Sequence, residues 1–380
     1  MLLLQKIGRD KIEPLSGENF AATKMPPRLK PLQPPHLSLD TFKALCNAAT
    51  EFGSLAPWEY MCDTALFGIQ DAGQVRLGSV LGNDGEPSPC ALFVHRGELG
   101  LRWVMAVCFG GQQDSDDPNF MYSDDALMAE FVSRNKLEQH DIDLLNQIGF
   151  QPLANPKREW PKFRSYRPGA IPWFLEQGEA ELLLSDLRVA IAFVQLFAGK
   201  KDLYDDSADN EVPFCPKNTT GPMRVEDLDW QKLVLTPEPL PIPVSLSDSE
   251  LAGLRALPQN ERLSLELDCL YSPGGVDEEP RPHFLWMGIA VDTREGVLLD
   301  SVMGNSQTQK PEQVAARCLL QAITKLKCRP KEILMSRTSL AFALEPITRP
   351  LEIKTSHVAK LKELDVIYRR LQRSVDLDRC

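Results

Sequence analysis

Apolar residues repeat along the chain with two periods, and each change of period marks a change between helices and strands. A helical repeat over residues 39–53 follows Ser38, a residue type that caps helices well, and ends at Gly53. A longer repeat covers residues 176–198 and ends at Gly199. Its apolar positions are Ala180, Leu183, Leu187, Ala190, Ile191, Val194 and Phe197. Both segments are predicted to be helices with one buried face.

Between these two helices the pattern predicts a small antiparallel sheet. The apolar runs "CALFVHR" and "LRWVMAVCF" are separated by the turn-like "RGELG", so residues 60–110 are expected to form a meander of strands. Helical patterns follow at residues 124–135 and 138–148. The first domain is therefore expected to belong to the α+β class.

Four prolines at alternate positions mark the boundary between two domains. They stand at positions 237, 239, 241 and 243, where they exclude both a helix and a central strand. We predict an irregular N-terminal arm over residues 1–37 and an α+β domain over 38–232. A proline-rich linker over 233–247 then leads to a second domain over 248–380.

The second domain has the predicted order β-β-β-α-β-α-β-α. Three strand-like runs, which contain "RLSLELDCLYS", "HFLWMGIAVDT" and "VLLDSVMG", precede a helix that starts at Pro311. Helices and strands then alternate to a last helix with an apolar stripe. That stripe is Val358, Leu361, Leu364, Tyr368, Leu371 and Val375. A mixed sheet is expected.

The composition is that of a globular protein and does not indicate a particular activity. The chain has 380 residues, 43% hydrophobic and 25% charged, which is typical of a globular protein with real cores. Nine cysteines, an odd number, occur without any C-x-x-C pair, and this favours free thiols in a reducing compartment. The apolar start "MLLL" is too short for a signal or membrane segment. A cytoplasmic protein that does not enter a membrane is expected.

Residues 262–375, with three leading strands and then alternating helices and strands, resemble the ribonuclease-H-like fold. The two-domain arrangement also resembles bacterial proteins of unknown function, on the stretch "PWEYMCDTALFGI" and the glycine-rich turn that follows. That second resemblance implies no activity. The first implies an α/β domain and, in active nucleases of the fold, four carboxylates that hold two divalent ions.

The carboxylates that the nuclease resemblance requires are only partly present. Asp268 stands on the first strand, Glu312 begins the first helix, and Asp365 lies on the last helix, where Glu363 is a second candidate. At the end of the fourth strand Ser336 and Arg337 occupy the place of an acid. We therefore interpret Asp268 as a polar residue on the solvent side of a strand, or as one that hydrogen-bonds a turn. The alternative is a nuclease or phosphoryl-transfer enzyme that uses Asp268 with Mg²⁺ or Mn²⁺.

Basic residues gather near the C-terminus of an otherwise acidic chain. Residues 309–373 hold fourteen Lys/Arg and six Asp/Glu, a net +8, although the chain totals −11. Lys362, Arg369 and Arg373 share one face of the last predicted helix. This face could attract nucleic acid, an acidic protein or the acidic first domain, or simply be solvated.

Three weaker candidates lie in the first domain. "DSDDPNFMYSDD" at residues 114–125 has acids at some positions of a calcium loop but lacks its glycine. Cys62 would need His95 close by to become reactive. Trp173, beside Phe174, could anchor an interface between domains, form a homodimer contact, or enter the core.

No complete catalytic constellation follows from these residues. The sequence therefore favours a non-catalytic binding or regulatory protein whose binding residues are Lys362, Arg369, Arg373 and Trp173. The metal-dependent enzyme centred on Asp268 remains the alternative.

Overall fold

The computed structural model describes residues 32–71, 74–82, 89–109, 119–152, 160–205, 207, 210–216, 222–237, 240–278 and 280–377. The chain divides into two compact units, one over residues 33–237 and one that begins at residue 238. They are called the N-terminal unit and the C-terminal unit below. Residues 1–31 of the predicted arm lie outside the described part.

The N-terminal unit is built on one seven-stranded sheet in the order β5-β4-β3-β2-β1-β6-β7. Its strands are β1 (Phe67–Asp71), β2 (Gln74–Leu81), β3 (Cys90–Arg96), β4 (Ala126–Val132), β5 (Trp160–Tyr166), β6 (Glu211–Cys215) and β7 (Asp229–Lys232). Neighbouring strands are antiparallel except for β1 and β6, which are parallel. The sheet is thus larger than predicted and mixed.

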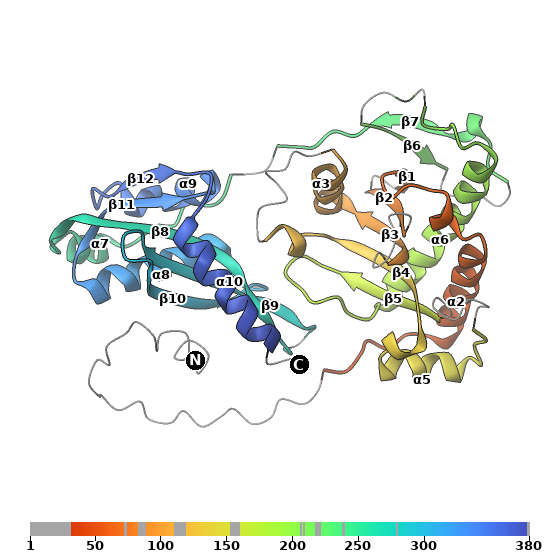
Figure 1. Ribbon diagram of the computed structural model, residues 1–380, viewed down its shortest axis with the longest axis horizontal. Coiled ribbons are helices and arrows are strands. Elements are labelled where there is room, and N and C mark those ends of the chain that lie inside the picture. Colours follow the sequence, from red (N-terminus) through yellow and green to blue (C-terminus); the bar gives the residue numbers. More distant parts are fainter. Residues whose placement is uncertain are drawn as a thin grey trace. The chain divides into compact units, whose positions relative to one another are not determined.

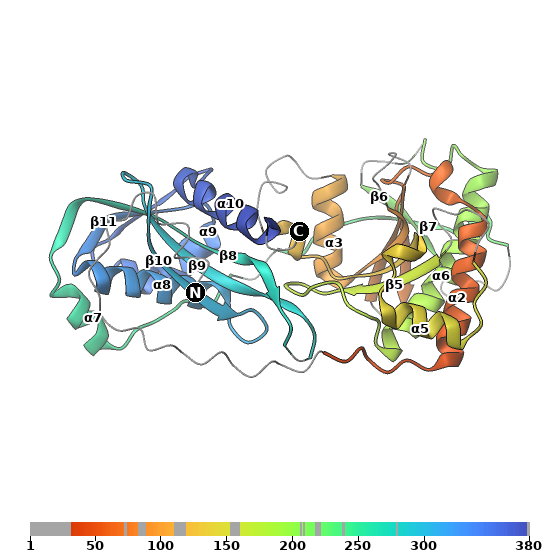
Figure 2. The ribbon, with the colours of Figure 1, turned by 60° about the horizontal axis from the view of Figure 1, so that its bottom comes forward.

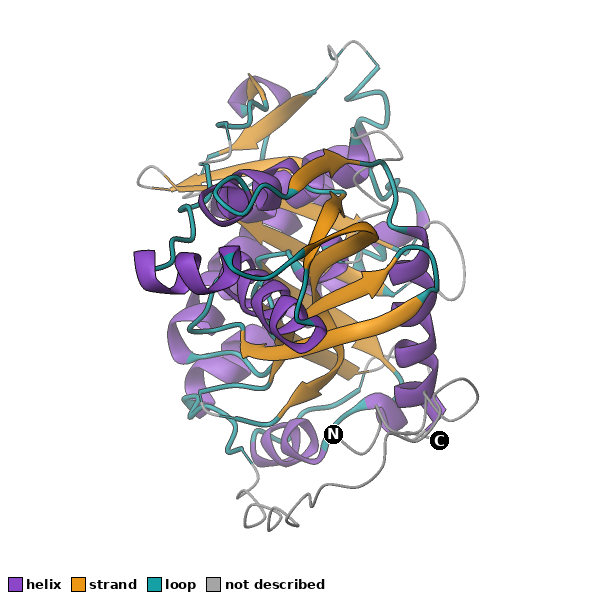
Figure 3. Ribbon diagram, turned by 90° about the vertical axis from the view of Figure 1, so that its left-hand side faces the viewer, coloured by secondary structure: helices purple, strands orange, loops and turns teal. Residues whose placement is uncertain are grey.

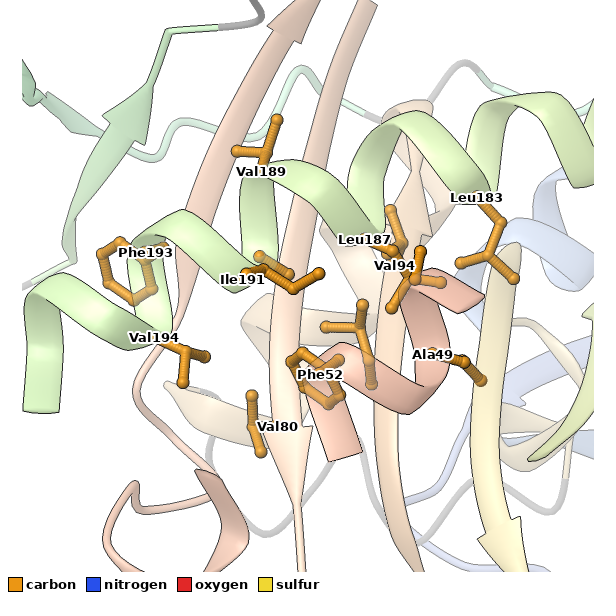
Figure 4. Close-up of a cluster of buried hydrophobic side chains, with 14 of the residues drawn as sticks. Ala49, Phe52, Val80, Val94, Leu183, Leu187, Val189, Ile191, Phe193 and Val194 are labelled. Atoms are coloured by element: carbon orange, nitrogen blue, oxygen red, sulfur yellow. The ribbon is translucent and has the colours of Figure 1, made fainter. Parts of the chain in front are cut away.

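Helices cover both faces of this sheet (Figure 1). They are α2 (Leu39–Ser54), α3 (Gly97–Cys108), α5 (Gln139–Gln147) and α6 (Gln177–Gly199). Helices α2 and α6 pack on one face, and Figure 4 shows their side chains, among them Phe52 and Leu187, meeting strand residues such as Val80 and Val94. Helix α3 packs on the other face through Leu101.

Two predicted helices are confirmed: the one that begins after Ser38, which is α2, and the one that ends at Gly199, which is α6. Ser38 Oγ accepts the N–H of Thr41 at 3.4 Å, as an N-cap does. Helix α6 is long and apolar enough to cross a membrane by length and composition. It is nevertheless a core helix of this unit, because Asp186 in its middle is fully buried and ion-paired with Arg76 of β2 at 2.9 Å.

Two predicted elements of the N-terminal unit are wrong. The run from Leu101, predicted as a strand after a hairpin, lies in helix α3, which buries Leu101 and Val104 at helical spacing. Residues 126–132, predicted as helix, form strand β4, which is almost entirely buried between β3 and β5. Short, nearly continuous apolar runs fit either structure, and pairing in the sheet decided both cases. Strand β5 was not predicted.

The C-terminal unit contains a five-stranded sheet in the order β10-β9-β8-β11-β12. Its elements are α7 (Asp248–Arg255), β8 (Gln259–Val276), β9 (His283–Asp292), β10 (Val297–Asn305), α8 (Pro311–Leu326), β11 (Arg329–Met335), α9 (Thr338–Thr348), β12 (Lys354–His357) and α10 (Lys362–Leu377). Strands β8, β9 and β10 are antiparallel, whereas β11 and β12 run parallel to β8. After α7, the predicted order β-β-β-α-β-α-β-α and the mixed sheet are confirmed. This is the ribonuclease-H-like arrangement.

The two faces of this sheet carry different helices. Figure 2 shows α8 and α10 on opposite sides of the strands, and Figure 3 shows helices beside the strands in a view from the side of this unit. Helix α10 buries Leu364 and Tyr368 against Leu270 and Ile289. On the α8 side a Cβ at Gly288 would lie 3.0 Å from Cys318 Cβ, so a larger residue there would push the helix away.

Edge strands of both sheets are short, irregular or partly paired. Strands β7 and β12 have four residues each. The pairing of β10 shifts register between Leu298 and Asp300, and Trp173 makes an isolated bridge to Ser165 of β5.

Candidate functional site

Asp268 lies in the central strand β8 and faces helix α10. It pairs with Ile289 of β9, a residue of the apolar cluster under α10. Its neighbours Leu267 and Cys269 are fully buried on either side along the strand. Asp268 is itself 5% exposed, so the predicted solvent-side position is wrong. Its carboxylate has lost most of its water and needs a partner in the protein.

That partner is Arg337. Its Nε donates to Asp268 Oδ1 at 3.0 Å, Nη2 also contacts Oδ1, and Nη2 donates to the carbonyl oxygen of Cys269 at 2.8 Å. Strand β11 runs parallel to β8 with Leu334 beside Glu266, and Arg337 follows two residues after β11 ends. The topology therefore places Arg337 beside Asp268.

A second acid of β8, Glu266, serves a structural purpose. Its Oε2 accepts the backbone N–H of Leu364 at 2.7 Å, at the N-terminus of α10. Burial raises the pKa of the Glu266 carboxyl, and hydrogen bonds from the first N–H groups of α10 oppose this rise. Glu266 thus caps α10 from another strand and holds the helix against the face that contains Asp268.

The other acids do not gather at Asp268. Glu312 lies in the first turn of α8, on the opposite face of the sheet from α10. Asp365, in the first turn of α10, accepts an ion pair from Lys360 at 3.2 Å. Within the described residues no group of three or more His, Cys, Asp or Glu is placed to hold a metal ion. A guanidinium on Asp268 opposes a divalent cation there, so these residues do not fit a two-metal centre.

Exposed basic residues lie along α10: Lys362, Arg369 and Arg373 share one face of the helix, and Arg370 lies to one side of it. Lys362, Arg369, Arg370 and Arg373 are exposed, and none of them forms an ion pair with another described residue. Val366, 45% exposed, lies between Lys362 and Arg369. We call these four cations the α10 stripe.

Candidates in the N-terminal unit are placed as follows. Trp173 is half-buried beside β5, and Phe174 is 7% exposed and in contact with the ring of Trp173. Cys62 contacts Thr64 at 2.7 Å, whereas His95 bonds to Ser79 and Asp124. The calcium-loop acids at positions 114 and 116 lie outside the described residues.

The last acid of that loop, Asp125, lies within the described residues and is paired with an arginine. Asp125 bonds to Arg96 at 2.5–2.8 Å. Burial raises the pKa of the Asp125 carboxyl, and Arg96 opposes this rise.

Comparisons with known proteins agree with a chain of two parts. Residues 42–214 match the family described as Domain of unknown function (DUF7309), and residues 250–372 match Domain of unknown function (DUF6930). The chain carries two domains of unknown function. A comparison with curated proteins gives no match.

One solved structure is similar to part of the chain. It is the catalytic core domain of HTLV-2 integrase in complex with magnesium, at 18% identity and a TM-score of 0.23, over 32% of this chain and 75% of that chain. The fold of the C-terminal unit follows from its own strand order.

Proposed function

We propose that the DUF6930 domain is a non-catalytic binding module, and that its α10 stripe binds a polyanionic partner. The observation that carries this proposal is the set of four exposed cations on one helix without an ion-pair partner among the described residues. The positions span 362–373, which is about 16 Å of helix at 1.5 Å per residue.

The chemistry of the stripe favours charge recognition along an extended anion. Three of the four cations are arginines, whose planar groups make paired hydrogen bonds with carboxylate or phosphate. Tyr368, the one aromatic residue of α10, is 3% exposed and bonds to Tyr271, so it offers no surface for base stacking. The partner would therefore be recognised by the charge and spacing of its anionic groups.

The ion pair of Asp268 and Arg337 supports the non-catalytic part of the proposal. The strand carboxylate that would anchor a metal is instead neutralised by an arginine. Because Glu266 fixes α10 to the same sheet, the stripe is held on a rigid scaffold. A rigid set of charges loses less entropy on binding than a flexible one.

Fluorescence anisotropy at low salt tests this proposal with a short DNA duplex and with poly-L-glutamate. Wild type is expected to bind at least one of these probes, with affinity that falls as salt rises. The double variant Arg369→Glu/Arg373→Glu should reduce the slope of log K against log salt by about one per residue. The two probes separate phosphate from carboxylate recognition.

Arg262→Glu is the matched control, because Arg262 is exposed on β8 away from α10 and in no described ion pair. The control should bind as wild type does. If neither probe binds wild type, or if the control weakens binding as much as the α10 variant, the stripe is a solvated face and the proposal fails.

A further inference from the structure

Three polar side chains under helix α3 form a hydrogen-bonded chain in the N-terminal unit. Ser79 Oγ lies 3.4 Å from His95 Nε2, and His95 Nδ1 lies 3.1 Å from Asp124 Oδ1. All three residues are buried, with exposures of 4%, 2% and 7%. The order hydroxyl, imidazole, carboxylate is the order in which a serine is activated as a nucleophile.

The register of the sheet produces this arrangement. Ser79 pairs with Phe93 and Leu77 pairs with His95, so Ser79 and His95 are diagonal neighbours on the same face. Asp124 stands two residues before Ala126, which pairs with His95 across β3 and β4. Strands β2 and β3 therefore hold Ser79 and His95, and the segment that leads directly into β4 brings Asp124 to His95.

The state of the imidazole follows from its partners. A carboxylate accepts only, so His95 Nδ1 donates its N–H to Asp124, and in the neutral imidazole the lone pair of Nε2 faces Ser79. The ring of His95 is stacked on Trp103 of α3 at 5.1 Å and 17°. Its orientation is thus fixed before any substrate arrives.

Two further observations concern helix α3, which covers these three hydrogen-bonded side chains. Trp103 Nε1 is buried and has no hydrogen-bond partner among the described residues, and such donors are rare unless they serve a purpose. Helix α3 also exposes apolar side chains on its outer side: Leu99 at 48% and Val107 at 51%, followed by Phe109 at 42%. The exposed outer side of α3 is therefore apolar, as its buried side is. Such an exposed apolar surface is suited to contact with an apolar ligand.

We propose that Ser79 is the nucleophile of an acyl-transfer site covered by α3, and that the site takes esters or thioesters with apolar acyl chains. Access requires α3 to move. Gly97, at φ +59°, starts the helix directly after β3 and is the natural hinge. Leu101 and Val104 hold the covered state by packing on the sheet.

The chemistry balances with water as the only co-reactant. Ser79 Oγ forms a bond to the acyl carbon while its proton passes to His95 Nε2. The bond from the acyl carbon to the alcohol or thiol breaks, and the leaving group takes that proton. Water then attacks the acyl-serine, gives its proton to Nε2, and Ser79 is released with its hydroxyl restored. Once α3 has closed over the bound ester or thioester, Trp103 Nε1 is the available donor to the developing oxyanion.

A fluorophosphonate probe tests the proposal on the full chain, with and without detergent micelles that would engage the apolar side of α3. Intact-mass measurement should show one adduct on wild type, and peptide mapping should place it on Ser79. Asp124→Asn should label at least about tenfold more slowly. Hydrolysis of p-nitrophenyl butyrate should fall in parallel.

Ser54→Ala is the matched control, because Ser54 is exposed at the end of α2 and its hydroxyl donates only to Glu51 O. It should label as wild type does. The proposal is overturned if wild type gives no adduct in either condition, or if mapping places the adduct elsewhere. Because the adduct is mapped on wild type, the test does not depend on whether a Ser79→Ala variant folds.

Discussion

Asp268 and Arg337 form an ion pair that neutralises a buried carboxylate in the central strand β8. Removing Arg337 leaves the buried carboxylate of Asp268 without its guanidinium, whereas removing both side chains leaves no buried ion at this point of the sheet. The first change costs more than the second, because an unpaired buried ion keeps its full desolvation cost. Their energies should therefore be strongly coupled.

Arg337→Leu is expected to lower the free energy of unfolding by about 1–3 kcal/mol, the cost of a buried polar group without its partner. Asp268→Leu/Arg337→Leu should be less destabilised than the sum of the two single variants. Urea denaturation of the four proteins measures this coupling. Additive losses would mean that the ion pair contributes nothing to the fold.

Sequence could place Asp268 and Arg337 together, because both stand at predictable points of neighbouring strands. It could not show that Glu266 caps α10, since this contact joins residues almost a hundred positions apart. One signal was available: α10 begins at "AKLKEL" without Ser, Thr, Asp or Asn before it. The bonds of Ser79, His95 and Asp124 depend on strand register, which the misassigned β4 concealed.

At the scale of elements, α10 depends on β8 for its first turn. The Glu266 carboxyl has a raised pKa, so the folded state binds its proton more tightly than the unfolded chain does. Its contribution to stability is therefore most favourable below about pH 4.5 and is lost as pH rises through the folded pKa.

Glu266→Gln is expected to keep the acceptor for Leu364 and to remove this pH dependence. Its unfolding free energy should change less than that of wild type as pH rises from about 4.5 to 7. Glu266→Ala should lose about 1 kcal/mol at about pH 4.5, as other capping losses do, and less as pH rises to about 7, because the contribution of Glu266 to wild-type stability declines over that range. Chemical denaturation at several pH values measures both. Parallel pH profiles for wild type and Glu266→Gln would contradict the assigned cause.

Elements of the C-terminal unit were predictable because turns and caps separate them, as Pro311 does at the start of α8. In the N-terminal unit α3 follows β3 with no intervening loop, and both are apolar. Without a change in composition at Gly97, the pattern of residues 90–109 could not show where strand becomes helix. Helix α6 was clear because its period persists over 23 residues.

At the scale of the molecule, the division near residue 237 separates two sheets with their own cores. We expect each unit to unfold cooperatively. A fragment of residues 238–380 should melt within roughly 4 °C of the matching transition of the full chain, equivalent to about 1 kcal/mol. Differential scanning calorimetry compares the two. Loss of cooperative melting in the fragment would show that the units depend on each other.

The edges of the two sheets bear on how the protein behaves at high concentration. A long, flat edge offers unpaired N–H and C=O groups to another chain and invites aggregation. Here β7 and β12 are too short to offer more than a few such groups, and Lys232 and Lys354 place charges there. The shifted register of β10 and the bridge from Trp173 interrupt the other two edges. Two open sheets in one chain are thereby protected against the strand-by-strand growth that leads to fibrils.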